Sequence, residues 1–353
     1  MIALVIGAAV IVFLNRGNIG EALSAGKKST GYTGDPFTFE SGSRQVCAPV
    51  GNGLALASTN GIQLLDSGGS TAAKQVYSMK TPALTACDTK AAAYDVGGTG
   101  ICTVDMKGNV TQTVSDDPII SAAMNENGWL TVCTQASGYK GRATVYNADG
   151  QAVYQWNSGE GYLLKAEVSP GGKYLAALCA GESGGAVHLF ALSSEKEQGT
   201  FTTPNELLTD MHWLTENRVC VLSQSRCAVI DRTGEQKGNY DFAGLYLTDY
   251  SFGGDGFAVL MLGKYRTGGT GTLMSVGSDG KLMGQAEIAS ELISITAHKK
   301  YVAALCSDVV KLFTQSMSLA GSGENTAGVK SAVPRLKGDV LLVSSYYAEI
   351  RSF

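Results

Sequence analysis

The sequence predicts an all-β fold: an eight-bladed β-propeller closed by an N-terminal strand. Two series of short apolar strands recur along the 353 residues, and a tight turn rich in Asp, Asn and Gly follows most strands of one series. Strand-only repeats of about forty residues are typical of propeller blades with four strands each. The 45 glycines and the low charged fraction of 16% also favour many tight turns between short strands.

The first series consists of strands that end at these turns. They read IQLL, ICTV, ATVY, VHLF, CAVI, LMSV, VKLF and AEIR, and they are followed by Asp66, Asp105, Asn147, Ala191, Asp231, Gly277, Thr314 and Ser352. The successive spacings are 39, 42, 44, 40, 46, 37 and 38 residues. We interpret each strand as the third of its blade and the turn as the hairpin to the fourth, where Asp and Gly serve backbone geometry.

The second series supports the same phase. About ten residues before each third strand lies another apolar strand: GLALAS, AAAYDV, WLTVCT, YLAALC, RVCVLS, FAVLML, YVAALC or VLLVSS. Turns with Gly or Asn, as in SPGGKYLAAL (169–178), lead into these second strands. One twisted blade cannot bury both of its faces, so neighbouring blades must stack and the ring must close.

The ends of the chain predict how the ring closes. The eighth unit stops at Phe353, directly after its third strand, and has no fourth strand. The segment DPFTFES (35–41) is a spare short strand before the first complete unit. We expect it to supply the missing strand of the last blade. Seven blades with a strand extension are the alternative.

The N-terminal segment differs from the repeats. Ile2–Leu14 is an apolar run of 13 residues, shorter than the about 20 that span a membrane. It fits a signal-peptide core, an anchor helix that begins upstream, or a buried element of the fold. Because a polar stretch follows it, we favour a single membrane anchor or signal-like segment (1–16), a linker (17–34) and an extracytoplasmic propeller domain (35–353).

Two motifs resemble known propellers. SPGGKYLAAL is similar to the Ser-Pro-Asp-Gly-Lys-x-Leu-Ala turn of WD40-like and quinoprotein-like propellers, with Gly171 in place of the Asp, whereas the Gly-His and Trp-Asp pairs of true WD repeats are absent. The stretch 138–178, behind an N-terminal apolar segment, resembles a bacterial family of membrane-anchored propellers of unknown function from Gram-positive anaerobes. The resemblance implies placement outside the cytoplasm and carries no catalytic residues.

The sequence contains no motif that indicates a cofactor, metal or nucleic acid. His188, His212 and His298 occupy different positions in their units and have no partner at metal-ligand spacing. No nucleophile elbow or phosphate loop is present. The net charge of −4, without a cluster of Lys and Arg, argues against nucleic acid as a partner.

The eight cysteines permit a disulfide framework, but their positions favour free thiols. Cys133, Cys179, Cys220 and Cys306 fall in second strands of different blades, where they pack as small apolar side chains. Cys220 and Cys227 share a hairpin, but a short turn places Leu222 opposite Cys227.

The candidate binding residues lie in loops between second and third strands. Three of these loops are predicted to be long, at 134–142, 180–185 and 263–271. Two of them carry a Tyr, Lys and Arg group, and these side chains are common at binding hot spots. The candidate residues are Tyr139, Lys140, Arg142, Lys264, Tyr265 and Arg266.

These observations predict a non-catalytic, extracytoplasmic binding or scaffold module. We expect one propeller face to be presented to an envelope protein or glycan. The alternative is a propeller enzyme, such as a lyase, a hydrolase or a quinoprotein-like protein, with its site at the central channel. A third possibility is a structural domain of an envelope assembly without a small ligand.

Overall fold

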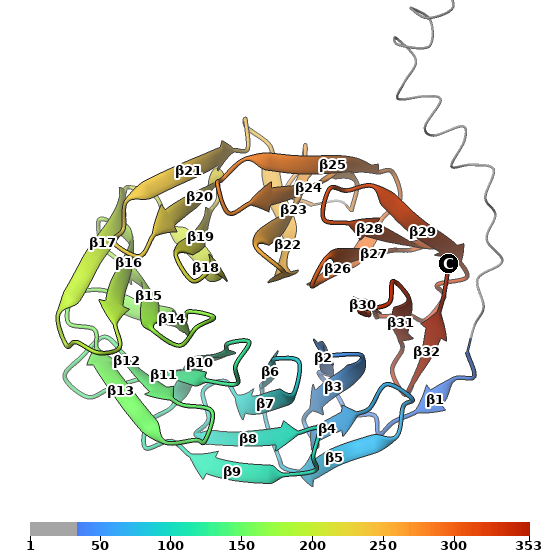
Figure 1. The fold of residues 1–353 in the computed structure, drawn as a ribbon, viewed down its shortest axis with the longest axis horizontal. Helices are drawn as coiled ribbons and strands as arrows, with labels where there is room; N and C mark the ends of the chain where they lie inside the picture. The colour runs from blue at the N-terminus through green and yellow to red at the C-terminus, as the bar shows by residue number, and fades with distance from the viewer. Residues whose placement is uncertain (1–33, 268) are drawn as a thin grey trace, which may run out of the picture.

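Eight four-stranded antiparallel sheets form a closed ring around a central opening in a computed structural model of the chain (Figure 1). The structure describes residues 34–267 and 269–353. Within these ranges every regular element is a strand, and no helix could cross a membrane. Eight blades are therefore confirmed over seven. The predicted anchor helix (1–16) and nearly all of the linker lie outside the described residues.

The first four blades follow one another along the chain. Blade 1 contains β2 (Val46–Val50), β3 (Gly53–Ser58), β4 (Gly61–Leu65) and β5 (Thr71–Val76). Blade 2 contains β6 (Pro82–Ala86), β7 (Lys90–Asp95), β8 (Gly100–Asp105) and β9 (Val110–Val114). Blade 3 contains β10 (Ile119–Met124), β11 (Leu130–Thr134), β12 (Arg142–Tyr146) and β13 (Ala152–Asn157). Blade 4 contains β14 (Tyr162–Val168), β15 (Tyr174–Gly181), β16 (Gly184–Ala191) and β17 (Glu197–Pro204).

The remaining blades complete the circle. Blade 5 contains β18 (Leu208–Thr215), β19 (Arg218–Ser223), β20 (Arg226–Asp231) and β21 (Gln236–Asp241). Blade 6 contains β22 (Tyr246–Gly254), β23 (Phe257–Gly263), β24 (Gly271–Gly277) and β25 (Leu282–Ile288). Blade 7 contains β26 (Leu292–His298), β27 (Tyr301–Cys306), β28 (Val309–Thr314) and β29 (Leu319–Glu324). Blade 8 contains β30 (Ser331–Pro334), β31 (Val340–Val343), β32 (Tyr347–Arg351) and β1 (Phe37–Thr38).

Burial follows the position of a strand within its blade. The second strands are almost wholly buried, as in β3 and β23, because both of their faces pack against neighbouring blades. The outermost strands are mostly exposed, and every residue of β9 is exposed. The core therefore lies between blades. Between blades 4 and 5, for example, Leu178 and Leu189 pack with Met211 and Trp213.

The recurring turn serves backbone geometry, as predicted. In blade 2 the Asp105 carboxylate accepts hydrogen bonds from the N–H groups of Lys107 and Asn109, both at 2.9 Å. Gly108 has φ of +89°, a conformation that L side chains rarely adopt. Asp231 makes the same pair of contacts with its own turn, at 2.8 and 3.1 Å.

The N-terminal strand closes the ring. β1 pairs antiparallel with β32 in blade 8, with Phe37 opposite Ala348 and Thr38 opposite Tyr347. Gly34 N–H donates to the Ile350 carbonyl at 2.9 Å, and Phe39 N–H donates to the Tyr346 carbonyl at 3.1 Å. The predicted closure is confirmed, although the strand itself covers two residues of the segment 35–41.

The connections divide the propeller into two faces. The turn face carries the turns between first and second strands and between third and fourth strands. The loop face carries the loops between second and third strands and the passages from one blade to the next. On the loop face, residues 135–141 form a long loop, and residues 264–267 and 269–270 belong to a second long connection, as predicted.

The prediction of a long loop at 180–185 is wrong. Strand β15 continues to Gly181 and β16 begins at Gly184, so only two residues turn between them. Gly181 pairs with Gly184 in the ladder, and Gly184 has φ of +135°. The glycines that suggested an open loop instead permit a tight hairpin.

The eight cysteines are free thiols in this structure, and seven of them are buried. Leu222 pairs with Cys227, as the hairpin register predicted. The Sγ atoms of Cys220 and Cys227 lie 3.0 Å apart as a thiol contact. Burial raises the pKa of the Cys133 thiol to about 12 and that of Cys179 to about 11. These thiols are therefore protonated core side chains at neutral pH.

Candidate functional site

The predicted binding residues lie on the loop face in two groups. Tyr139 and Lys140 belong to the loop of blade 3, and Arg142 is the first residue of β12. The other three, 264–266, belong to the loop of blade 6. Blades 4 and 5 separate the two groups, so the structure does not join them into one compact site. Tyr139 is 51% exposed and Tyr265 is 75% exposed.

Arg142 differs from the other five candidates. Its Nε donates to Asn157 Oδ1 at 3.0 Å, and its guanidinium forms an ion pair with Asp117 at 3.4 Å. Asp117 lies in the connection from blade 2 to blade 3, and Asn157 is the last residue of β13, just before the connection to blade 4. The side chain is thus engaged in holding these segments together.

Sequence reasoning missed two tyrosines that complete the groups. Lys140 Nζ lies 4.7 Å from the centre of the Tyr162 ring, and Arg266 Cζ lies 5.3 Å from the centre of the Tyr246 ring. Each tyrosine is the first residue of the innermost strand of its blade, β14 or β22. The sequence carries no signal for them, because the exposure of these two rings is visible only in the assembled structure.

The exposed tyrosines are confined to one face. In the part of the chain that the structure describes, five tyrosines are among the exposed large hydrophobic residues: Tyr139, Tyr162, Tyr246, Tyr265 and Tyr346. All five lie in loops or strand starts of the loop face. Four of them lie on blades 3, 4 and 6, and we call these four the tyrosine arc (Tyr139, Tyr162, Tyr246 and Tyr265). Leu207, 50% exposed, lies between them on blade 5.

A groove opens on the loop face between blades 5 and 6. Its volume is about 720 Å³, within the roughly 300–1,000 Å³ of ligand pockets. Tyr246 and Arg266 line it beside Ser223, Ser225 and Asp249. Burial raises the pKa of the Asp249 carboxyl. The groove therefore offers an aromatic ring, a guanidinium and several hydrogen-bonding groups to a partner.

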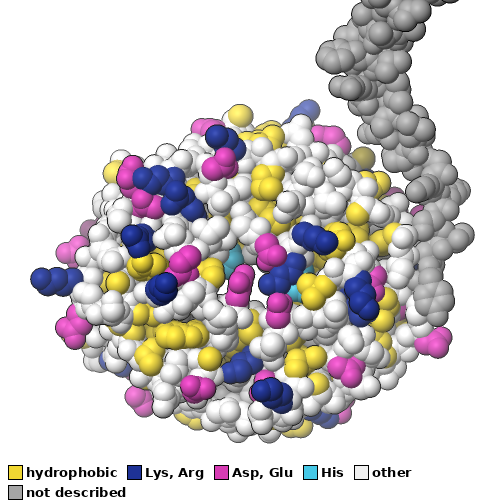
Figure 2. Space-filling view, viewed as in Figure 1, with side chains coloured by type: hydrophobic (Ala, Val, Ile, Leu, Met, Phe, Trp, Pro, Cys, Tyr) yellow, Lys and Arg dark blue, Asp and Glu magenta, His cyan; other side chains and the backbone are white. Residues whose placement is uncertain are grey.

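The central opening contains a smaller cavity on the turn-face side. Its volume is about 140 Å³, and its lining includes Glu167, His212, Trp213, Phe252, His298 and Lys299. Lys, Arg, Asp, Glu and His side chains gather around the central opening in Figure 2. The three histidines occupy different positions in their repeat units, and ring closure brings two of them, His212 and His298, to this cavity.

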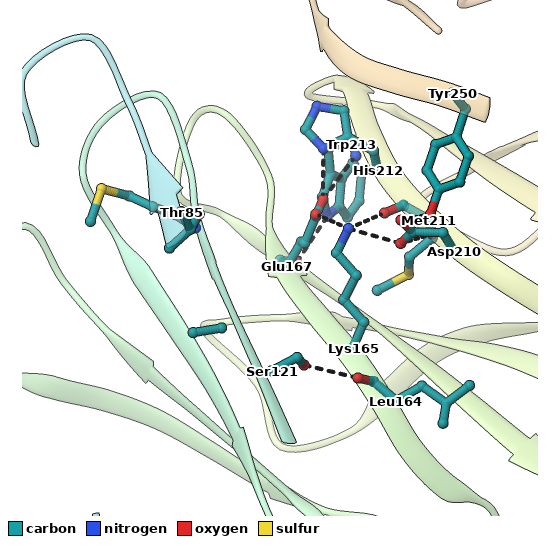
Figure 3. A network of polar contacts seen from close by, with 12 residues as sticks. Thr85, Ser121, Leu164, Lys165, Glu167, Asp210, Met211, His212, Trp213 and Tyr250 are labelled. Carbon is teal, nitrogen blue, oxygen red and sulfur yellow. Dashed lines mark hydrogen bonds and ion pairs between the residues drawn. The ribbon is translucent and has the colours of Figure 1, made fainter. Parts of the chain in front are cut away.

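An ion network of half-buried side chains around the buried Glu167 joins the innermost strands of blades 4, 5 and 6 (Figure 3). Lys165 Nζ lies 2.8 Å from Glu167 Oε1 and 2.8 Å from Asp210 Oδ1, and it donates to the Met211 carbonyl at 3.0 Å. The Tyr250 hydroxyl donates to Asp210 Oδ2 at 2.8 Å. All three donors of the ammonium group are thus used. The two carboxylates raise the pKa of Lys165 despite its burial, so it stays charged.

Glu167 is the acceptor at the centre of this network. His212 Nδ1 lies 3.0 Å from Glu167 Oε2, and the Trp213 indole N–H donates to the Glu167 carbonyl at 2.9 Å. Burial raises the pKa of this carboxyl, but the opposite effect of Lys165 and His212 is larger, and the pKa falls to about 2. The His212 ring also stacks on Phe252 at 5.2 Å. The group therefore holds three blades together.

Charged side chains also cross the mouth of the cavity. Asp88 of blade 2 contacts His298 Nε2 at 3.4 Å and Lys299 Nζ at 3.1 Å, both from blade 7. Lys299 also reaches Asp255 of blade 6 at 3.6 Å. His298 Nδ1 must donate to the Pro334 carbonyl, at 3.0 Å, because that oxygen only accepts. The hydrogen bond from His298 lowers the pKa of Asp88, and this cluster narrows the opening.

The central cavity has room for a few water molecules and is small for an organic substrate. At about 30 Å³ per water molecule, 140 Å³ holds about four or five waters. Its charged groups already pair with each other. Over residues 34–267 and 269–353, no group of three or more His, Cys, Asp and Glu side chains is arranged to hold a metal ion.

Comparison with known proteins gives a family and a fold. DUF5711, described as a family of unknown function, matches residues 34–346. No curated protein matches the chain in sequence. The fold resembles the C-terminal WD40 domain of Sif2, with a TM-score of 0.64 at 10% identity over 91% of this chain and 98% of that one.

Two further solved structures share the architecture. BamB from Moraxella catarrhalis has a TM-score of 0.54 at 13% identity, over 92% of this chain and 100% of that one. The β-propeller domain of Myceliophteria thermophila Cps50 (Swd1) has a TM-score of 0.55 at 12% identity, over 78% of this chain and 98% of that one. At such identities these similarities establish the fold.

Proposed function

The chain belongs to the DUF5711 family, whose function is unknown, and we propose that it is a non-catalytic binding module that presents its loop face to a protein partner. The confinement of all five exposed tyrosines of the described residues to that face carries the proposal. Tyrosine supplies a rigid apolar ring and a polar hydroxyl, which is why it is enriched at protein interfaces. Structural similarity to the propellers of Sif2, BamB and Cps50 is consistent with such a role.

The proposal includes placement of the propeller outside the cytoplasm behind a membrane anchor at 1–16, with an envelope protein as the partner. The direction of β1 supports an orientation. β1 runs from the turn face to the loop face, because it is antiparallel to β32, which leaves the loop face. The chain therefore enters β1 from the turn face. An anchored propeller would hold its turn face toward the membrane and its tyrosine arc outward.

A propeller enzyme with a site in the central cavity is the second candidate. Glu167 holds Nδ1 of His212, which fixes the imidazole much as a carboxylate orients a catalytic base. Two observations argue against this candidate. The cavity of about 140 Å³ is below the usual size of a substrate pocket. Lys165 and Glu167 are already engaged in contacts with each other and with neighbouring groups.

Site-specific photo-crosslinking tests the proposal. A photoreactive amino acid replaces Tyr139 or Tyr265 in the full chain in intact cells, and Met283 is the control position. Met283 is 40% exposed on the outer strand β25, away from the loop face. We expect protein adducts from the two tyrosine positions and few from Met283. Equal adducts from all three positions, or none from the tyrosine positions, would contradict the proposal.

Alanine variants of the four residues of the tyrosine arc give the quantitative test. A hot-spot side chain contributes about 2 kcal/mol or more, so each substitution should weaken capture of the crosslinked partner about tenfold or more. His212→Ala separates the two candidate functions. This variant should capture the crosslinked partner as well as the wild type does if the loop face binds that partner. If the cavity is catalytic, the variant should lose the catalytic activity of the cavity.

A further inference from the structure

The outer strand of blade 2 is an unprotected sheet edge. β9 reads Val-Thr-Gln-Thr-Val, and it is the last strand of its sheet, so one row of its backbone N–H and C=O groups has no partner strand. All five residues are exposed, and Val114 is 75% exposed. Among the outer strands that the structure describes, no other is exposed along its whole length.

Other outer strands carry features that discourage edge pairing. Lys, Gly or Pro residues interrupt five of them, β5, β17, β21, β25 and β29. These residues are Lys74, Gly199, Pro204, Lys237, Gly238, Gly284, Gly321 and Gly323. In β13 the rings of Tyr154 and Trp156 instead pack on Phe190, at 6.3 and 5.1 Å. β9 has none of these features, and β-branched residues with high strand propensity form four of its five positions.

The sequence of β9 is complementary to itself. In an antiparallel pair of two copies centred on Gln112, Gln112 lies opposite its own equivalent. Thr111 then lies opposite Thr113, and Val110 lies opposite Val114. Pairs of like β-branched residues, and threonine pairs, stabilise neighbouring antiparallel strands, and no like charges meet in this register.

The ends of the strand are complementary in charge. The same register places Lys107, just before β9, opposite position 117 of the second copy and thus one residue from Asp116, and the two-fold axis repeats this proximity. Both residues are exposed, and neither has an ion-pair partner within the described ranges. The contact would therefore compete with no existing pair.

The geometry of the blade determines how two copies would lie. In Figure 1, β9 runs along the perimeter of the ring with β8 inside it. A two-fold axis that joins two β9 strands into one continuous sheet is perpendicular to that sheet, and hence nearly parallel to the channel axis. The two propellers then lie side by side and present the same face in the same direction.

We propose that β9 pairs antiparallel with β9 of a second copy of this chain, forming a two-fold dimer whose sheet continues from one blade 2 to the other. The occupant is a second copy because the strand and its flanking charges complement themselves. Since a five-residue strand pair is small compared with the about 1,200 Å² of a stable interface, we expect reversible association. The proposal is independent of the partner-binding function.

Cysteine crosslinking of the full chain in membranes tests the pairing. Directly opposed residues on antiparallel strands have Cα separations of about 4.5–5.5 Å, within the range that a disulfide bridges. Gln112→Cys should give a covalent dimer in a buffer of oxidised and reduced glutathione, visible on a non-reducing gel. The matched control is Gln155→Cys, exposed on the adjacent outer strand β13. We expect at least tenfold less dimer from the control.

Charge exchange tests the register. In the Gln112→Cys background, Lys107→Asp or Asp116→Lys should each reduce the covalent dimer several-fold, and the two together should restore it. Unchanged circular dichroism spectra would show that the variants remain folded. Equal crosslinking at positions 112 and 155, failure of the double exchange to restore the dimer, or crosslinking of position 112 to a different protein would each overturn the proposal.

Discussion

Replacing Glu167 by Gln removes the charge at the centre of the ion network while keeping the shape of the side chain. The pKa of Glu167 is about 2, compared with an ordinary value of 4.5. Each pKa unit corresponds to about 1.4 kcal/mol, so the ionised carboxylate contributes about 3 kcal/mol to the free energy of unfolding at pH 7. The carboxylate now accepts from Lys165, from His212 and from the backbone N–H of Trp213, whereas an amide has one acceptor oxygen for these donors.

The pH dependence follows from the direction of the shift. The folded-state pKa is lowered, so the contribution is complete above pH 4.5 and is lost as the pH falls toward 2. At pH 3 the same relation leaves about 1.5 kcal/mol. We therefore expect the stability difference between wild type and Glu167→Gln to shrink from about 3 to about 1.5 kcal/mol between pH 7 and pH 3.

Urea unfolding followed by tryptophan fluorescence at the two pH values measures this difference. The control is Glu235→Gln, whose carboxylate is 69% exposed and pairs with Lys237 at the surface. A surface pair contributes about 0–1 kcal/mol, so the control should change little at either pH. A Glu167→Gln variant that loses less than about 1 kcal/mol at pH 7, or whose deficit is the same at pH 3, would refute this account of the network.

Three further predictions concern the fold and its orientation. The seven buried cysteines should resist alkylation in the native protein and react after unfolding, and rapid native labelling would contradict their burial. Gly69→Ala should lower the melting temperature more than Gly150→Ala, because both glycines have positive φ but an added Cβ at Gly69 lies 2.2 Å from Phe37 Cγ, whereas Gly150 has nothing within 4 Å. Equal melting temperatures would show that β1 does not pack there. If the chain is anchored as proposed, a probe at Asp149→Cys on the turn face should lie closer to the bilayer than one at Ser137→Cys on the loop face, and the reverse order would contradict the proposed orientation.

The periodic part of the fold could be predicted because each blade repeats a local signal. Third strands, their turns and the buried second strands are set by residues within about forty positions of each other. Closure was also predictable, since a missing fourth strand at one end matched a spare strand at the other. The hairpin at 181–184 was not, because glycines favour both an open loop and a tight turn, and only the pairing of Gly181 with Gly184 distinguishes them.

The sites depend on contacts between blades, and these have no local signal. Lys165 and Asp210 are 45 residues apart, and Asp88 and His298 are 210 apart, yet each pair meets at the centre of the ring. The side chains facing the channel are related by the curvature of the ring, which no pattern in one blade specifies. Similarly, Arg142 belonged to a promising loop sequence, but its partners Asn157 and Asp117 could be recognised only after the blade was assembled.

Blade 8 has a mechanical consequence. Its outermost strand comes from the opposite end of the chain, and that strand is also the point where the preceding segment joins the ring. Tension on that segment is therefore transmitted first to a two-residue strand and its few backbone hydrogen bonds. A sufficient pull would detach this strand and open the ring before any other blade lost a strand, so the integrity of the ring depends on the strand that would bear such a load.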